Sequence, residues 1–111
     1  MTRKAQEVIY LEYGLIRIDH IIRGHKGELH AYIFSKDVFK NIRNIKFIIH
    51  QVMMAHRMVR LECTVDKECK GLQRVLEMLG FEYESDVRKG VRISGKVKDG
   101  VRYVTFYGGE E

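Results

Sequence analysis

The sequence has no proline, no tryptophan, only two cysteines and no long apolar run. A membrane helix needs roughly 18 consecutive apolar residues, and no stretch approaches that length. No Pro-, Gly- or Ser-rich linker divides the 111 residues, so we expect one domain over residues 1–111. The first residues are charged and then alternate, without the apolar centre of a signal peptide, which favours a cytoplasmic protein.

The few residues that commonly bind metals are poorly spaced for a metal site. Cys63 and Cys69 lie six positions apart, and a structural zinc site needs more ligands at closer spacing. His20, His25 and His30 follow one another in steps of five, so neighbouring members face opposite sides of a strand. We therefore expect no metal, and two reduced, partly buried thiols, with Cys63 in a strand and Cys69 in the helix after it.

The charge balance is basic, with 20 Lys and Arg against 15 Asp and Glu and a net charge of +5. This balance permits a polyanionic partner such as nucleic acid without requiring one. The cations form two groups, which are Lys36, Lys40, Arg43, Lys46 and Arg57, and Arg88, Lys89, Arg92, Lys96 and Lys98. Tyrosines such as Tyr10 and Tyr83 would stack on bases in that case, although solvated surface charge is the commoner explanation of such groups.

Hydrophobic periodicity predicts six strands. They cover residues 8–12, 15–23, 28–34, 58–65, 81–97 and 101–107, with 91–97 either continuing 81–86 or starting anew. The first three should form an antiparallel meander. In the second strand, one face is expected to carry Ile16, Ile18, His20 and Ile22. Asp99-Gly100 has the composition of a hairpin turn before the last strand.

Two helices are predicted between the strands. Apolar residues in steps of three and four predict an amphipathic helix over residues 37–57, with N-cap side chains at 35–37. The second helix is expected to start after Asp66 as N-cap and to end at Gly80, which suits a left-handed C′ residue, with Phe81 folding back on the last turn. Its expected buried residues are Leu72, Val75, Leu76 and Leu79. The order β-β-β-α-β-α-β-β predicts an α+β fold with a mixed, mostly antiparallel sheet and two helices.

This order, together with three stretches of sequence, resembles the GNAT N-acetyltransferase superfamily. The stretches are RLECTV at 60–65, LGFE at 79–82, and KDG at 98–100 before RYVTFY at 102–107. The pattern is most similar to short, divergent GNAT-like proteins of bacteriophages, some of which are internal virion proteins. The resemblance implies a GNAT-like core that lacks the family's first strand and first two helices.

The sequence departs from the family where acetyl-CoA is bound. The family opens its long helix with a basic residue or Gln followed by x-x-G-x-G or x-x-G-x-A, and the glycines let backbone N–H groups approach the pyrophosphate. Residues 33–51 contain no glycine. Leu76 stands where the family often has a Tyr acid, and Cys69 stands where it has a helix-opening Asn.

The resemblance still implies positions for a cofactor and for a base. The candidates for binding acetyl-CoA are Tyr32, Ile33, Phe34, Lys36, Lys40 and Arg43. Backbone groups of the first three would line the pantetheine arm, and the basic side chains would meet its phosphates. The candidates for accepting a proton from an amine are Glu28 and Glu62, with His30 as a further base. The alternative is that these are ordinary strand residues and a solvated helix face.

Two functions follow from these observations. The first is acetyl-CoA-dependent N-acyl transfer by a divergent enzyme with a degenerate cofactor loop. The second is a non-catalytic interaction protein, associated with a phage or virion, that uses the fold as a scaffold and binds a protein or a polyanion. A sheet edge left open by the missing first strand would then favour a homodimer. A phage-encoded chain would act in the host cytoplasm or in the virion.

Overall fold

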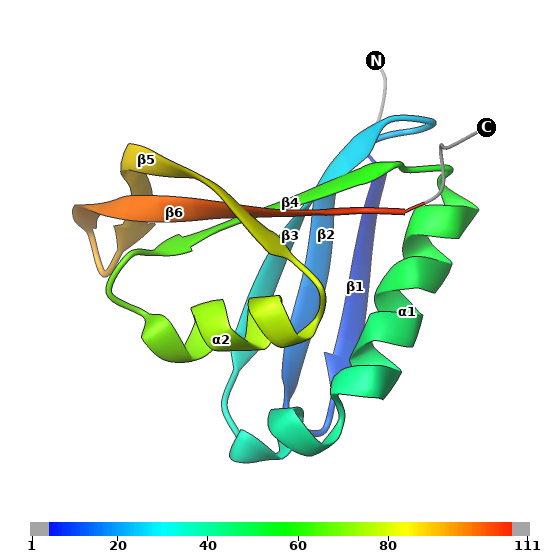
Figure 1. Cartoon of the computed structure of the whole chain (residues 1–111), viewed down its shortest axis with the longest axis horizontal. Helices are drawn as coiled ribbons and strands as arrows, with labels where there is room; N and C mark the ends of the chain where they lie inside the picture. The colour runs from blue at the N-terminus through cyan, green and yellow to red at the C-terminus, as the bar shows by residue number, and fades with distance from the viewer. Residues whose placement is uncertain (1–4, 108–111) are drawn as a thin grey trace.

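The computed structural model describes residues 5–107, which form one six-stranded sheet with two helices and a short 3-10 turn (Figure 1). The strands are β1 (Ala5–Leu11), β2 (Gly14–Ile22), β3 (Lys26–Ile33), β4 (Arg60–Asp66), β5 (Glu82–Ile93) and β6 (Lys96–Phe106). The helices are α1 (Ile42–Ala55) and α2 (Lys70–Met78), and η1 (Lys36–Lys40) is the 3-10 turn before α1. Strands and α-helices follow the predicted order, so the α+β class is confirmed.

Among residues 5–107, one pair of neighbouring strands is parallel. The sheet order is β1-β2-β3-β4-β6-β5, and the parallel pair is β3 and β4, which are joined through α1. These two strands pair at three positions, from Lys26–Arg60 to Glu28–Glu62, and then separate. Figure 1 shows β4 and β6 running at a wide angle to β1, β2 and β3. The predicted mixed, mostly antiparallel sheet is confirmed.

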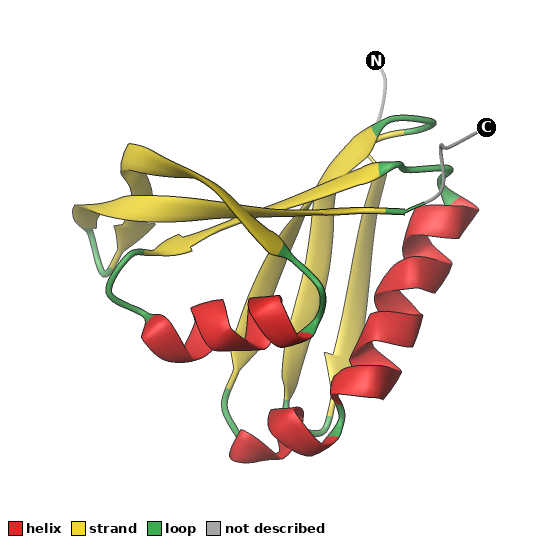
Figure 2. Cartoon of the chain, viewed as in Figure 1, coloured by secondary structure: helices red, strands yellow, loops and turns green. Residues whose placement is uncertain are grey.

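Both helices pack on one face of the sheet, and the core lies between them and the strands (Figure 2). In β4, Leu61, Cys63 and Val65 are buried while the residues between them are half exposed. The helices contribute Ile45, Ile49, Met53, Val75, Leu76 and Leu79 to the same core. No helix within residues 5–107 covers the opposite face of the sheet. We call that face, which carries Glu28 and Glu62, the outer face.

The second strand departs from its predicted alternation at His20. Ile16 and Ile18 are buried as expected, but His20 takes a φ of 51° and the pairing with β3 shifts between Asp19 and Ile22. The bulge adds a residue to one strand and so exchanges the two faces beyond it. As a result Ile21 enters the core, whereas Ile22 is 52% exposed.

The predicted helix over 37–57 is shorter and begins differently. Asp37 N donates to Ser35 Oγ at 3.2 Å, and Asn41 Nδ2 donates to Asp37 O at 2.8 Å, which caps a 3-10 turn instead of an α-helix. Such local side-chain bonds compete with the helical ladder. At the other end Arg57 takes a φ of 55°, and Met58 N donates to Met53 O at 2.8 Å. This is a Schellman stop with a non-glycine residue, which the sequence pattern did not indicate.

The second helix ends as predicted but starts later. Gly80 has a φ of 93°, its N–H donates to Glu77 O at 3.0 Å, and Phe81 N donates to Leu76 O at 2.9 Å. These two bonds form the predicted Schellman motif. The predicted N-cap at Asp66 is wrong, because its carboxylate accepts from Glu68 N in a turn and the helix begins at Lys70. Cys69 is therefore the residue before the helix rather than a member of it.

The predicted hairpin turn at Asp99-Gly100 is also wrong. Both residues lie inside β6, and the chain turns at Ser94-Gly95, where both φ angles are positive. Ser-Gly dipeptides also mark turns, and positive φ at both central residues is the geometry of a type I′ hairpin turn. Asp99 instead accepts a hydrogen bond from Lys89 N in a bulge of β5, and residues 82–93 form one irregular strand. This change of register decides which β6 residues lie beside β4.

Candidate functional site

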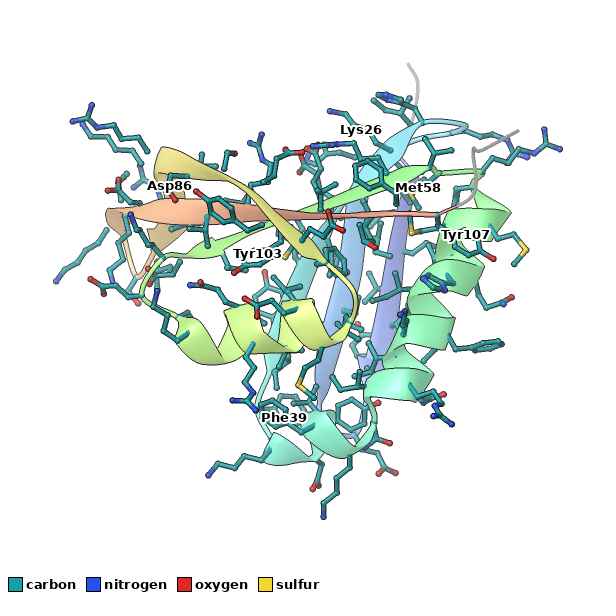
Figure 3. All side chains as sticks on the ribbon, in the orientation of Figure 1. Lys26, Phe39, Met58, Asp86, Tyr103 and Tyr107 are labelled. Carbon is teal, nitrogen blue, oxygen red and sulfur yellow. The ribbon has the colours of Figure 1, made fainter. Side chains whose placement is uncertain are left out.

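The separation of β3 from β4 opens a cleft through the sheet. A cavity of about 630 Å³, which we call the outer mouth, is lined by β3, β4, the start of α2 and residues 87–93 of β5. A second cavity of about 510 Å³, the inner mouth, lies on the helix side between η1 and α2. Phe39, labelled in Figure 3, lies at the inner mouth. The two cavities share Ala31, Cys69 and Leu72, so they adjoin within the cleft.

β3 and β4 each present an open backbone edge to this cleft. Their ladder ends at Glu28–Glu62, whereas β3 continues to Ile33 and β4 to Asp66. Over these segments β2 pairs with one edge of β3, and β6 pairs with one edge of β4. Because each strand has two edges, the N–H and C=O groups that face the cleft are left for a ligand or for water.

The structure brings most of the predicted site residues to the cleft. The outer mouth is lined by Glu28, His30, Tyr32 and Glu62. The inner mouth is lined by Ile33, Phe34 and Lys36. Lys40 and Arg43 line neither mouth, because the chain passes through η1 and α1 begins only at Ile42. The basic group predicted for phosphates is therefore divided.

Glu62, one of the two predicted carboxylate bases, is engaged in an ion-pair network. Its side chain is 12% exposed, and it accepts a hydrogen bond from Arg60 Nε at 3.1 Å, with Lys26 Nζ at 3.8 Å. Arg60 also holds both oxygens of Glu84, at 2.6 and 2.7 Å. The hydrogen bond to Glu84 is the main cause that raises the pKa of Arg60 above its ordinary value. A carboxylate held in this way is poorly placed to take a proton from a substrate.

Glu28 and His30 are less constrained. The Glu28 carboxylate is 46% exposed, and its ion-pair contact is with His20 Nε2 at 3.8 Å. The His30 ring is 37% exposed, with Nε2 at 3.6 Å from Asp19 Oδ2. An imidazole beside a carboxylate is a common arrangement for proton transfer. Of the predicted bases, these two have the freer atoms in the outer mouth.

The two cysteines differ sharply in environment, which corrects the expectation of two partly buried thiols. Cys63 is buried in β4, and desolvation raises its pKa to about 12. Cys69 is exposed and lines both mouths. Cys63 is therefore inert at neutral pH, whereas Cys69 reports on the cleft.

The backbone near the inner mouth does not form the family's phosphate cradle. The N–H groups of residues 34, 37 and 38 already donate to Tyr13 O, Ser35 Oγ and Ser35 O. Asp37 adds a negative charge to the first turn of η1. Leu76, at the position of the family's Tyr acid, is fully buried in the core and carries no proton to donate. The departures in the sequence thus have structural counterparts.

Sequence reasoning did not place Ala31 or Arg102 at the site, and it named Arg92 only as part of a basic group for a polyanion, although all three line the outer mouth. Ala31 has no charged, polar or reactive group by which its role could be recognised in the sequence. Arg102 lies opposite Thr64 of β4. The predicted last strand, residues 101–107, contains Arg102, but the sequence did not show which residue of β4 would lie beside it. No pattern in the sequence marked the bulges that set this register.

Residues 5–107 show neither a metal-binding cluster nor a membrane-spanning helix. No group of three or more His, Cys, Asp or Glu side chains among residues 5–107 is arranged to hold a metal ion. Neither helix in this part of the chain is long and apolar enough to cross a membrane.

Comparison with known proteins identifies the fold. No family model and no curated protein matches the sequence. Solved structures do match, at low identity. A variant of spermidine N-acetyltransferase from Vibrio cholerae superposes with a TM-score of 0.72 at 17% identity, over 93% of this chain and 65% of that one. A GNAT-family acetyltransferase from Bacillus anthracis gives 0.69 at 16% identity, over 85% and 58%.

A third similar structure contains the cofactor. It is the microcin C7 self-immunity acetyltransferase MccE in complex with acetyl-CoA and AMP, with a TM-score of 0.72 at 14% identity, over 86% of this chain and 54% of that one. The chain thus spans between 54% and 65% of the length of these three proteins. At such identities the similarity defines the fold alone. The chain has the fold of the GNAT acetyltransferases, reduced to its six-stranded sheet and two helices.

Proposed function

We propose that the chain binds the thioester arm of acetyl-CoA in the cleft between β3 and β4 and transfers the acetyl group to an amine. The observation that carries this proposal is the early end of the β3–β4 ladder, which leaves two open backbone edges around a cavity that crosses the sheet. An extended pantetheine arm suits such an edge, because its amides pair with backbone groups as a strand does. The acceptor then enters from the outer mouth.

The residues of the outer mouth suit attack by an amine. Acetyl-CoA supplies an acetyl group activated as a thioester. Glu28 and His30 are placed to take a proton from the attacking nitrogen, and the open N–H groups of the strand edges are placed to stabilise negative charge on the carbonyl oxygen. Ala31 borders both mouths, and its small side chain leaves the passage between them open. A larger residue there would close the passage.

The nucleotide end of acetyl-CoA is expected to bind weakly. The backbone N–H groups of residues 34, 37 and 38 are already bonded, so we expect Lys36 to be the main contact for phosphate. Contacts of exposed lysines with phosphate are screened by salt. We therefore expect affinity for acetyl-CoA to fall with added salt but to persist through the arm.

Calorimetry with acetyl-CoA, CoA and ATP at low and moderate salt tests this function. Binding that is selective for acetyl-CoA and CoA over ATP, and that survives moderate salt, supports it. Lys36→Glu should weaken binding at low salt, whereas Lys96→Glu, the same charge change at an exposed site outside both mouths, should not. No binding, or equal and salt-labile binding of all three nucleotides, would rule it out.

A non-catalytic role is the second candidate function. It is favoured by the engaged Glu62, the bonded N–H groups near η1 and the buried Leu76, which together remove several parts that catalysis uses. In that case the chain uses the fold to bind a protein or polyanion partner, as expected for a phage or virion-associated protein. No binding of acetyl-CoA, or equal and salt-labile binding of all three nucleotides, would favour this role.

A further inference from the structure

Two of the three carboxylates that line the outer mouth are already held by cations. Glu62 accepts a hydrogen bond from Arg60 Nε at 3.1 Å. Asp66 accepts one from Lys98 Nζ at 3.3 Å and is a half-buried residue of β4. Carboxylate oxygens that already accept charge-assisted bonds have little capacity left for a ligand. The third carboxylate, Glu28, is therefore the one that remains available for an amine.

Two guanidinium groups line the same mouth without such partners. Arg92 of β5 and Arg102 of β6 make no side-chain hydrogen bond and no ion pair with the residues of the 5–107 segment. The charge of Arg102 contributes to lowering the pKa of Glu84, after the larger effect of the hydrogen bond from Arg60, and both oxygens of Glu84 are bonded to Arg60. A guanidinium offers five N–H donors in a planar fork that fits a carboxylate or a phosphate.

The strand register sets the distance between these two kinds of group. Glu28 lies beside Glu62, and Arg102 lies beside Thr64, two residues further along β4. With strands about 4.8 Å apart and a rise of about 3.4 Å per residue, the Cα atoms of Glu28 and Arg102 are separated by about 12 Å. Side chains stand roughly perpendicular to a sheet, so the charged groups of Glu28 and Arg102 stay apart by a gap of this order. The gap leaves room for one small molecule with a group of opposite charge at each end.

We propose that the acceptor is a small amine that also carries an acidic group, either a carboxylate or a phosphate. Arg102, with Arg92, binds the acidic group, and Glu28 and His30 receive the amine. That the bound amine is an acetyl acceptor rests on the proposed acetyl transfer. The selectivity for an anionic group depends only on the residues of the outer mouth. A polyamine, which lacks any acidic group, would bring cations next to two unpaired guanidiniums.

Binding of matched amines to the protein without any acetyl donor tests this inference. The probes are γ-aminobutyrate against butylamine for a carboxylate, O-phosphoethanolamine against ethanolamine for a phosphate, and spermidine as the polyamine. Dissociation constants come from NMR titration at low salt. We expect at least one acidic amine to bind at least tenfold more tightly than its counterpart without the acidic group and than spermidine. The pair that shows this preference identifies the acidic group.

Variants separate the cleft from general basic charge. Arg102→Gln should remove most of the preference while leaving the fold intact by circular dichroism. Arg88→Gln is the control, because Arg88 is an exposed arginine of β5 that lines neither mouth. An equal loss in both variants, no preference in the wild type, or tighter binding of spermidine would overturn the inference. Preference for the acidic amine without any acetyl-CoA binding would support the anion-selective outer mouth and contradict the proposed acetyl transfer.

Discussion

Cys63 and Cys69 lie six residues apart yet differ in burial, which controls access to a thiol. Cys63 is buried with a pKa of about 12, and Cys69 is exposed where the two mouths of the cleft meet. The thiolate is the reactive species, so only the exposed thiol should react at neutral pH. At the scale of single residues, this makes Cys69 a natural reporter of what occupies the cleft.

We expect one of the two thiols to react quickly with an aromatic disulfide reagent at pH 7.5, and the second only after unfolding. Acetyl-CoA should slow the reaction of Cys69 at least several-fold, because the ligand would cover it. Cys69→Ser should remove the fast phase and Cys63→Ser should keep it. A fast phase that acetyl-CoA leaves unchanged would argue against a ligand in the cleft.

Acid should destabilise the protein through specific carboxylates. Hydrogen bonds lower the pKa values of three carboxylates. Asp66 accepts a bond from Glu68 N, Asp86 accepts one from Tyr83 Oη, and Glu84 accepts bonds from Arg60. A carboxylate whose folded pKa lies below its unfolded value stabilises the fold above the unfolded pKa of about 4, and this contribution is lost as pH falls through the folded pKa. The free energy of unfolding should therefore decrease below about pH 4.

Urea unfolding between pH 6 and pH 3 measures this loss. Asp86→Asn should flatten the dependence on pH, since it removes one of the three carboxylates. Asp37→Asn is the control, because that carboxylate makes no ion pair with another described residue. If the two variants flattened the curve equally, specific hydrogen bonds would not be its cause.

At the scale of the element, α2 has one glycine within it and one just beyond its end, and their roles are opposite. Gly80 holds a φ of 93° in the Schellman motif, whereas Gly71 lies inside the helix with open space where a Cβ would be. An L-residue at positive φ costs about 1–2 kcal/mol. An alanine in place of glycine within a helix gains roughly 0.5–1 kcal/mol.

The same substitution should therefore have opposite effects at these two positions. Gly80→Ala should lower the free energy of unfolding by about 1 kcal/mol, and Gly71→Ala should raise it by roughly 0.5–1 kcal/mol. Chemical denaturation of both variants measures the difference. A stabilising Gly80→Ala would contradict the left-handed helix stop.

The elements also show how far the sequence was informative. Strands and helices with strong periodicity were predicted within a few residues, as was the stop at Gly80. The misses arose where side chains or positive φ angles acted locally, at His20, Asn41, Arg57 and the turn at Ser94. Those features leave no mark in hydrophobic spacing, yet they decide the strand register. The strand register brought Arg102 to the candidate site, whereas the 3-10 turn η1 kept Lys40 and Arg43 away from it.

At the scale of the whole molecule, β1 is an edge strand, since among residues 5–107 it pairs with β2 alone. Its charged residue Glu7 is bound to His56 at 2.8 Å, and Tyr10 is 82% exposed. Edge strands that are not protected by free charge tend to pair with a second copy. We therefore expect a homodimer through β1.

Sizing with light scattering should give twice the monomer mass at micromolar concentration. Val8→Lys adds a charge to the edge strand and should produce the monomer, whereas Val97→Lys, an equally exposed valine at the distant hairpin, should leave the dimer. A monomeric wild type would remove this expectation.

The most direct test of the cleft as the acetyl-CoA site is the affinity of a variant in which the passage is filled. Ala31 borders both mouths, so Ala31→Leu should close the cleft, and Ala55→Leu is the same change on the exposed end of α1. Thermal denaturation should first show that both variants are folded. Calorimetry should then show the affinity for acetyl-CoA reduced at least tenfold in Ala31→Leu and unchanged in Ala55→Leu. Equal binding by wild type and Ala31→Leu would place acetyl-CoA elsewhere and contradict the proposed function.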